Sequence, residues 1–350
     1  MIMADKIFLT GATGFVGSAL LNRFIADGAS VKALVRSESV GLPGGVEKIF
    51  GDLSGLVGDF QVVKTPRFAR DDEESNGCKG SDSVGDSPVT LAMNLKGCDV
   101  VVHTAARVHI IRGEGTEYLR VNRDATLVLA RLAAEAGVKR FVFVSSIKVN
   151  GEMTRPGNVF VSEISQTPTD PYGLSKREAE QGLLEIAKQS GMEVVIVRPP
   201  LVYGPNVKGN FAAMVNWVKK GVPLPLGAMR NARSLVALDN LVDFIAVCAD
   251  PARSPKAANE VFLISDGVDV STSELLRKVA RALGVKSRLF PIPVGLMSFT
   301  ARLLGKGAVA DRLFGNLQVD SSKACDLLGW RPVVTMDEQL HKMYEGDRKK

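Results

Sequence analysis

A glycine-rich turn near the start of the chain restricts its fold more than any other feature of the sequence. Gly11, Gly14 and Gly17 follow directly after an apolar run at Lys6–Thr10, and they open a segment with helical apolar spacing. Glycines allow a tight turn and let the backbone approach a pyrophosphate, whose charge then meets the N-terminus of the helix. The strand–turn–helix context therefore predicts dinucleotide binding at this turn.

Short β-rich runs alternate with helical stretches through the first two hundred residues. The helical stretches include Val16–Phe24 and Asn122–Ala136, and Gly137 closes the second of them. Alternation of this kind is typical of an α/β fold with a doubly wound parallel sheet, the Rossmann arrangement. The predicted strands are Lys6–Thr10, Val31–Val35, Val100–Thr104, Arg140–Ser145 and Val194–Arg198.

The composition changes after Arg198 to turns rich in proline and glycine with short helices, which predicts a smaller C-terminal substrate lobe. We expect a dinucleotide-binding Rossmann domain of residues 1–203 and 234–262, with Ser234–Ala249 returning to the main sheet. The substrate-binding lobe is expected to comprise residues 204–233 and 263–350.

Residues 56–88 break the alternation of strands and helices. They contain an acidic run at 71–74 and a stretch rich in Gly, Ser and Asp that lacks an apolar period. We therefore expect a disordered insertion here, with Val89–Leu95 as the remnant of a crossover helix.

The composition excludes several classes of protein. The net charge is +6, aromatic residues make up 6%, and no basic tract is longer than Arg348–Lys350, so nucleic-acid binding is not expected. Four scattered cysteines without a C-x-x-C motif and three histidines favour reduced thiols in the cytoplasm, with no metal site. No apolar run reaches about 18 residues, so we expect no membrane span, and a strand starting at Lys6 leaves no room for a signal peptide.

Tyr172 and Lys176 lie four residues apart in a segment that can start a helix, with Asp170 as the N-cap and Pro171 at the first helical position. On a helix both side chains project from one face. A phenol has a pKa near ~10, so catalysis at pH 7 needs about 4 kcal/mol of preferential phenolate stabilisation. A neighbouring ammonium can supply part of it. The spacing alone is weak, but it gains support from the glycine turn and from Ser146, which follows an apolar strand.

Arg36 follows the second predicted strand, where NAD-preferring proteins usually place a carboxylate. An arginine there can meet a 2′-phosphate, which favours NADP(H), although a solvated side chain is the alternative. Asp52 and Leu53, in the run G-D-L, are expected to close the adenine pocket.

These motifs, in this order, resemble the extended short-chain dehydrogenase/reductase family and, more narrowly, its NAD-dependent epimerase/dehydratase branch, which acts on nucleotide sugars. The resemblance rests on G-A-T-G-F-V-G, G-D-L, H-T-A-A at 103–106, V-S-S at 144–146 and Y-G-L-S-K, and it covers the chain except Leu56–Pro88. It implies that Tyr172 is the catalytic acid/base, that Lys176 binds the nicotinamide ribose and that Ser146 orients the sugar oxygen. The NAD(P) contacts that we expect are Gly11, Thr13, Gly14, Phe15, Val16, Gly17, Arg36, Asp52, Leu53, Thr104, Ala105, Ala106, Asn122, Ser145, Tyr172, Lys176 and Pro199.

The residues after Ser146 narrow the chemistry. Sugar-nucleotide 4,6-dehydratases resemble this run but carry Asp–Glu where this chain has Ile147 and Lys148, so dehydration is disfavoured. Lys148 either contacts the sugar or points to solvent. In relatives, segments like those around Lys208, Asn210 and Arg233 hold the diphosphate of a UDP-sugar; Arg233 fits best because its fork meets phosphate oxygens bidentately, whereas Lys208 can equally be surface charge.

The linked motifs look most like bacterial O-antigen enzymes that reduce UDP-4-keto-6-deoxy-N-acetylglucosamine at C4 to UDP-N-acetyl-quinovosamine, whose close relatives are commonly labelled UDP-glucose 4-epimerase. The resemblance implies an NAD(P)-dependent C4 ketoreductase. A UDP-sugar 4-epimerase and a non-catalytic dinucleotide-binding protein are the alternatives, and a homodimer is the habit of the family.

Overall fold

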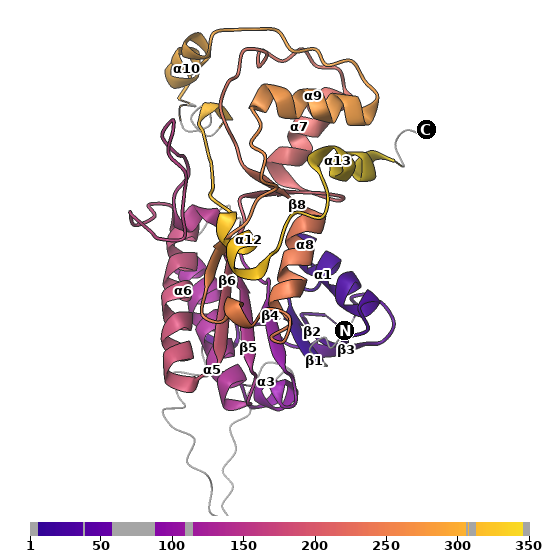
Figure 1. Ribbon diagram of the computed structural model, residues 1–350, viewed down its shortest axis with the longest axis vertical. Coiled ribbons are helices and arrows are strands. Elements are labelled where there is room, and N and C mark those ends of the chain that lie inside the picture. Colours follow the sequence, from indigo (N-terminus) through magenta and orange to yellow (C-terminus); the bar gives the residue numbers. More distant parts are fainter. Residues whose placement is uncertain are drawn as a thin grey trace, which may run out of the picture. The chain divides into compact units, whose positions relative to one another are not determined.

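The computed structural model of the chain describes residues 6–37, 39–57, 88–108, 115–305, 307 and 313–345 (Figure 1). The chain divides into two compact units. The first unit consists of Met1–Phe143, Ser175–Val194 and Ala249–Ala252, and the second of Val144–Leu174, Val195–Cys248 and Arg253–Lys350. The domain boundaries given above remain a prediction.

The strands are β1 (Lys6–Thr10), β2 (Ser30–Val35), β3 (Val46–Phe50), β4 (Val100–His103), β5 (Arg140–Val144), β6 (Glu193–Arg198), β7 (Leu201–Tyr203), β8 (Leu235–Ala237) and β9 (Val261–Leu263). The helices are α1 (Phe15–Ala26), α3 (Pro88–Leu95), α4 (Gly115–Tyr118), α5 (Ala125–Glu135), α6 (Pro171–Ser190), α7 (Gly209–Lys219), α8 (Leu238–Cys248), α9 (Thr272–Leu283), α10 (Val294–Leu303), α12 (Ser322–Leu328) and α13 (Met336–Tyr344). Shorter helical turns are the π-helix Leu119–Asp124 and the 3₁₀ turns Ile147–Val149 and Pro255–Ala257.

A parallel seven-stranded sheet flanked by helices confirms the predicted fold class. Its strand order is β3-β2-β1-β4-β5-β6-β9, and β1, β2 and β3 lie side by side in Figure 1. The order reverses between β1 and β4, which is where open α/β sheets bind their ligands beyond the carboxyl ends of the strands. Ile7 aligns with Val31 on one side and with Val100 on the other.

Strands β1, β4 and β5 are mostly apolar and buried because helices cover the sheet. Phe8, Leu9, Val101, Phe141 and Phe143 are fully buried. Helix α1 adds Leu20, Leu21 and Phe24 from one stripe. The expected helical pattern of this segment is therefore confirmed.

The second unit contains its own small sheet and core. Strands β7 and β8 pair in parallel. Side chains from α7, α9 and α13 form a common cluster around Tyr203, Phe211, Leu276 and Leu340. Capping boxes start α9 at Ser271 and α13 at Thr335, which fixes the two helices that close this core.

One expectation about the sheet was wrong. Within Ser234–Ala249, the strand β8 pairs with β7 and not with the main sheet. The main sheet is extended instead by β9, which pairs with β6. Strands β8 and β9 are both three residues long and apolar, so their sequences do not show which sheet each strand joins.

The predicted crossover remnant Val89–Leu95 is confirmed as α3 (Pro88–Leu95). The predicted disordered insertion falls largely on residues 58–87, which lie outside the described residues. None of the helices in the described part of the chain combines the length and the apolarity that a membrane crossing requires.

Candidate active site

The glycine turn has the geometry that a pyrophosphate site requires. Gly11 has a φ of +74°, and the amide of Gly14 donates to its carbonyl at 2.8 Å. A Cβ on Gly17 would overlap that carbonyl and lie 2.8 Å from Thr104 Oγ1. Gly14 is the N-cap of α1 and offers no side-chain cap, so the first amides of the helix remain available for an anion. The residues present fit the phosphates of a dinucleotide.

Further predicted cofactor residues of the first unit follow the carboxyl ends of its strands. Arg36 is exposed directly after β2. After β3, Asp52 accepts the amide of Ser54 at 3.0 Å, and Leu53 is buried. Thr104, Ala105 and Ala106 follow β4, where Thr104 donates its hydroxyl to the Thr10 carbonyl at 2.7 Å. Within the sheet these positions share one edge.

Ser145, Pro199 and Tyr172 are the predicted cofactor residues that belong to the second unit. The Ser145 hydroxyl, at the end of β5, is buried and makes no hydrogen bond to the residues that the structure describes. Such an orphaned hydroxyl is costly unless a ligand satisfies it. Pro199 follows β6, and its carbonyl accepts the amide of Ile147 at 3.0 Å, which fixes the chain next to Ser146.

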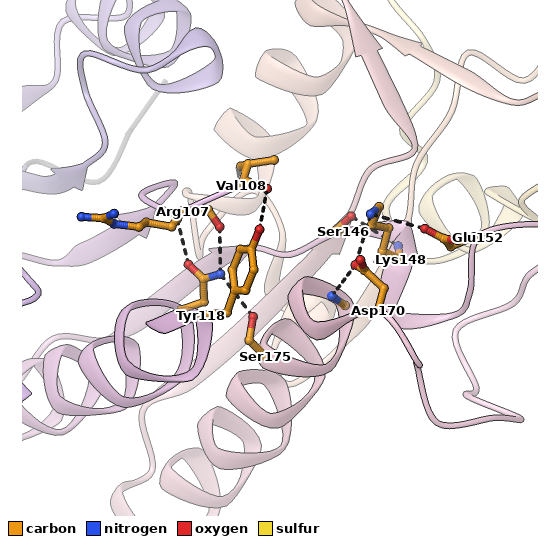
Figure 2. A network of polar contacts seen from close by, with 10 residues as sticks. Arg107, Val108, Tyr118, Ser146, Lys148, Glu152, Asp170 and Ser175 are labelled. Atoms are coloured by element: carbon orange, nitrogen blue, oxygen red, sulfur yellow. Dashed lines mark hydrogen bonds and ion pairs between the residues drawn. The ribbon is translucent and has the colours of Figure 1, made fainter. Parts of the chain in front are cut away.

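Asn122 anchors the loop that follows β4. It lies in the π-helical turn before α5 and is buried. Its Oδ1 accepts the amide of Arg107 at 2.9 Å, and its Nδ2 donates to the Arg107 carbonyl at 3.0 Å and to Ser175 Oγ at 3.2 Å (Figure 2). Tyr118 donates to the Val108 carbonyl at 3.2 Å in the same network. Asn122 therefore holds a loop in place through its own amide group.

Lys176 is almost completely buried in α6. Its ammonium lies 4.1 Å from the centroid of the Phe143 ring, which stabilises the charge through a cation–π contact. Burial nevertheless lowers the pKa of Lys176 to about 7, and nearby Glu180 opposes the shift. Burial therefore disfavours the charged form of this lysine.

His103 lies against Phe143, the ring that contacts the Lys176 ammonium. Its ring stacks on Phe143 with centroids 5.7 Å apart, and its nitrogens bond to Thr10 Oγ1 at 2.6 Å and Thr126 Oγ1 at 2.9 Å. Burial and the charge of Lys176 lower the pKa of His103 to about 3. The imidazole is neutral at physiological pH, so it adds no second charge beside Lys176.

Tyr172 lies on the first turn of α6, one turn before Lys176, and is half-buried. Asp170 accepts the amide of Gly173 at 3.0 Å, as expected of the N-cap. A Cβ on Gly173 would lie 2.6 Å from the Lys148 carbonyl. Glycine in the Y-G-L-S-K motif therefore lets the helix begin directly against the 3₁₀ turn Ile147–Val149.

Ser146 caps that 3₁₀ turn, and its Oγ accepts the amide of Lys148 at 3.3 Å. The Lys148 ammonium pairs with Asp170 at 3.1 Å and Glu152 at 3.5 Å (Figure 2). It also lies 5.8 Å from the centroid of the Tyr172 ring. The arrangement provides a hydroxyl, a phenol and cations, which are the groups needed to bind a carbonyl and move a proton.

The remaining predicted substrate residues belong to the second unit. Lys208 is exposed at the N-cap of α7, and the side chain of Asn210 lies outside the described residues. Arg233 is half-buried, donates to the Gly315 carbonyl at 3.0 Å, and burial lowers its pKa. The residues that come just before Arg233 in the sequence line a cavity of about 620 Å³. The lining of this cavity includes Arg230 and Arg277.

Sequence reasoning did not single out several residues that shape the site. Phe143 was predicted only as part of a strand, and His103 was noted only as the first residue of the H-T-A-A motif. Ser175 was part of the Y-G-L-S-K motif but was given no role, and Arg107, the other partner of Asn122, carried no signal. A phenylalanine in a buried strand always reads as core, so nothing in the sequence marks its contact with an ammonium.

Comparison with known proteins places the chain among enzymes. The family model described as "NAD dependent epimerase/dehydratase family" matches residues 7–264. The chain is 43% identical over 342 residues to a UDP-glucose 4-epimerase of Vibrio cholerae. The matched region covers 96% of this chain and 93% of that protein.

Solved structures share the fold over almost the whole chain. A UDP-N-acetylglucosamine 4-epimerase from Bacillus cereus superimposes with a TM-score of 0.71 at 19% identity, over 98% of this chain and 99% of that one. A dTDP-glucose 4,6-dehydratase from Streptomyces venezuelae with bound NAD gives a TM-score of 0.69 at 22% identity, over 98% of both chains. At these identities the likeness shows the fold alone.

Proposed function

The chain belongs to the NAD-dependent epimerase/dehydratase family, and from this premise we propose that it is an NAD(P)-dependent oxidoreductase acting at C4 of a UDP-sugar. The reaction we favour is the reduction of UDP-4-keto-6-deoxy-N-acetylglucosamine to UDP-N-acetyl-quinovosamine, in the synthesis of surface polysaccharide in the cytoplasm. The similarity to a UDP-glucose 4-epimerase supports the substrate class and the position of attack.

The observation that carries the proposal is a buried ammonium one helical turn from a half-buried tyrosine. Burial lowers the pKa of Lys176 to about 7, so the charged form of the side chain is destabilised at this position. Proteins keep such groups where chemistry needs them. A positive charge here favours the phenolate of Tyr172 over the phenol.

Tyr172 would act as the acid of the reduction. Bound NAD(P)H would supply a hydride to C4 of the keto sugar and leave as NAD(P)⁺. Tyr172 then gives its phenolic proton to the former carbonyl oxygen, so one C–H and one O–H bond replace the π bond of the ketone. Solvent returns a proton to the phenolate before the next turnover. Ser146 donates a hydrogen bond to the same oxygen and fixes its position, since its neutral hydroxyl cannot supply charge.

The residues after Ser146 support reduction over dehydration. Elimination of a sugar hydroxyl requires one group that protonates the leaving oxygen and another that removes the carbon-bound proton. Ile147 is an apolar, buried side chain, and Lys148 pairs with Asp170 and Glu152. Neither position offers the carboxylate that the elimination needs.

The substrate diphosphate would bind in the second unit. The segment predicted to hold it lines the cavity of about 620 Å³, where Arg230 and Arg277 offer guanidinium groups. Guanidinium groups bind phosphate oxygens bidentately. Arg233, whose charged form is disfavoured by burial, would gain most from an anionic neighbour.

NADP(H) is slightly favoured as the cofactor. Arg36 is exposed at the end of β2, where a 2′-phosphate would lie in a dinucleotide fold. An exchangeable reduced cofactor suits a reductase, which must take up a new hydride for each turnover. A homodimer is part of the proposal and is tested by light scattering of the purified protein.

The second candidate is a UDP-sugar 4-epimerase, and the observation that favours it is the 43% identity to the Vibrio cholerae enzyme. An epimerase oxidises C4, turns the keto sugar and reduces its other face with the same hydride. It would use the same tyrosine and lysine. It differs in that it retains NAD and needs no added cofactor.

The test offers the purified protein UDP-4-keto-6-deoxy-N-acetylglucosamine with NADH or NADPH and follows oxidation of the nicotinamide. We expect turnover by the wild type and none by Tyr172→Phe, which should still bind the cofactor. Interconversion of UDP-N-acetylglucosamine and UDP-N-acetylgalactosamine without added cofactor, together with tightly bound NAD, would establish the epimerase instead. Unchanged turnover by Tyr172→Phe would remove the mechanism.

A further inference from the structure

Lys148 and Asp170 form an ion pair beside the tyrosine, on the first turn of its helix. We propose that they are positioning residues that shift the pH dependence of proton transfer by Tyr172 in opposite directions. The inference rests on the proposed function, because it requires Tyr172 to act as the acid of the reaction.

The Lys148 cation lies near the Tyr172 ring. Its ammonium lies 5.8 Å from the centroid of the Tyr172 ring, and its side chain is 36% exposed. The backbone of Lys148 touches the helix start at Gly173, where a Cβ would lie 2.6 Å from its carbonyl. Both its backbone and its side chain are therefore fixed against the turn that carries Tyr172.

Asp170 contacts both the start of α6 and the Lys148 side chain through the same carboxylate oxygen. Its Oδ2 accepts the amide of Gly173 at 3.0 Å and the ammonium of Lys148 at 3.1 Å (Figure 2). The same carboxylate caps α6 and holds the cation near the phenol. Glu152, at 3.5 Å from the Lys148 ammonium, is a weaker partner four residues further along the chain.

A cation beside a phenol favours its ionised form, and a carboxylate disfavours it. Lys176, on the same helix as Tyr172, acts in the same direction as Lys148 while it holds its proton. Asp170 and Glu152 act against both lysines. With the 5.8 Å from the Lys148 ammonium to the ring centroid taken as the separation, and an effective dielectric constant of 40 to 80, this charge shifts the titration by about 0.5 to 1 pH unit. Asp170 partly cancels Lys148, so its removal should leave more of the lysine's charge uncompensated.

The experiment measures kcat against pH for reduction of the keto sugar by the preferred nicotinamide. Activity should fall at high pH, where Tyr172 has lost the proton that it must donate. Lys148→Met should move this fall to higher pH by about 0.5 to 1 pH unit, because the phenol keeps its proton longer. Asp170→Asn should move it to lower pH, because the lysine is no longer neutralised. Asparagine caps a helix about as well as aspartate, so α6 should keep its start.

Two further variants separate electrostatics from structural damage. Lys148→Arg keeps the charge and should restore the wild-type profile. Lys188→Met makes the same change of charge near the other end of α6, where the side chain is 77% exposed, and should leave the profile in place. Thermal unfolding of each variant checks that it is folded.

The outcomes distinguish this inference from the proposed function. Opposite shifts in Lys148→Met and Asp170→Asn support it. An active wild type whose profile does not move in these variants, or moves in the same direction in both, would overturn this inference alone. A wild type without nicotinamide-dependent turnover would overturn the proposed function and this inference with it.

Discussion

Replacing Lys176 with methionine should make the protein more stable at neutral pH while it abolishes activity. Methionine has a similar length and fills the same space without a charge. The wild-type ammonium is almost completely buried in α6, and the Phe143 ring at 4.1 Å recovers only part of its lost hydration. Lys176, which the reaction needs, therefore lowers the stability of the folded protein.

The magnitude follows from the pKa of Lys176, which falls from 10.5 to about 7 because burial disfavours the charged form. At about 1.4 kcal/mol per pH unit, that interval corresponds to roughly 5 kcal/mol. Below pH 7 the lysine is charged in the folded and the unfolded chain, so the whole penalty is present. Between pH 7 and 10.5 only the unfolded chain holds the proton, so the penalty shrinks as pH rises and is absent above that window.

Urea unfolding of the cofactor-free protein at pH values from 6 to 10.5 measures this difference. We expect Lys176→Met to exceed the wild type by several kcal/mol in free energy of unfolding at pH 6 to 7, and the gap to close by pH 10.5. The comparison of two proteins at each pH cancels the titration of the other groups. A gap of constant size at all pH values would refute the reasoning, because it would not arise from the charge of the lysine.

Three further predictions follow from single side chains. Gly17→Ala should weaken NAD(P) binding by at least about tenfold, because its Cβ would overlap the backbone of the glycine turn; Gly44→Ala, with open space around its Cβ, should bind as the wild type does in calorimetric titration. His103→Gln should flatten the loss of stability between pH 6.5 and 3, because the pKa of His103 is lowered to about 3 by burial and only the unfolded chain takes up the proton in that window; equal acid unfolding curves would contradict this. Arg36→Asp should turn the preference from NADP(H) to NAD(H) in steady-state kinetics, and an unchanged ratio of kcat/KM for the two cofactors would show that Arg36 does not meet the phosphate.

The main sheet could be predicted from the sequence where its signals are local and strong. Strands β1 and β2 and helix α1 follow from apolar runs and the glycine turn, which act over a few residues. Strand β3 was missed because its side chains alternate between exposed and buried at the edge of the sheet. Strand β9 was missed because three residues are too few to show a period.

The site could be predicted only in part. The motifs gave the residues that lie in sequence beside a glycine turn or a strand end, such as Gly11 and Ser146. They could not give pairs that are distant along the chain. Lys148 and Asp170 are 22 residues apart, and neither was expected to contact the other. Such pairs arise from the packing of α6 against the turn after β5, which no local pattern encodes.

The central claim is that Tyr172 passes a proton to a sugar oxygen while a hydride from an exchangeable nicotinamide reaches C4. The most direct measurement supplies the keto sugar with NADPH or NADH that carries deuterium at the transferred position and examines the product by mass spectrometry and NMR. We predict one deuterium at C4 of the product for each nicotinamide oxidised by the wild type, and no product with Tyr172→Phe. A product without deuterium, or interconversion of C4 epimers with no nicotinamide consumed, would contradict the claim.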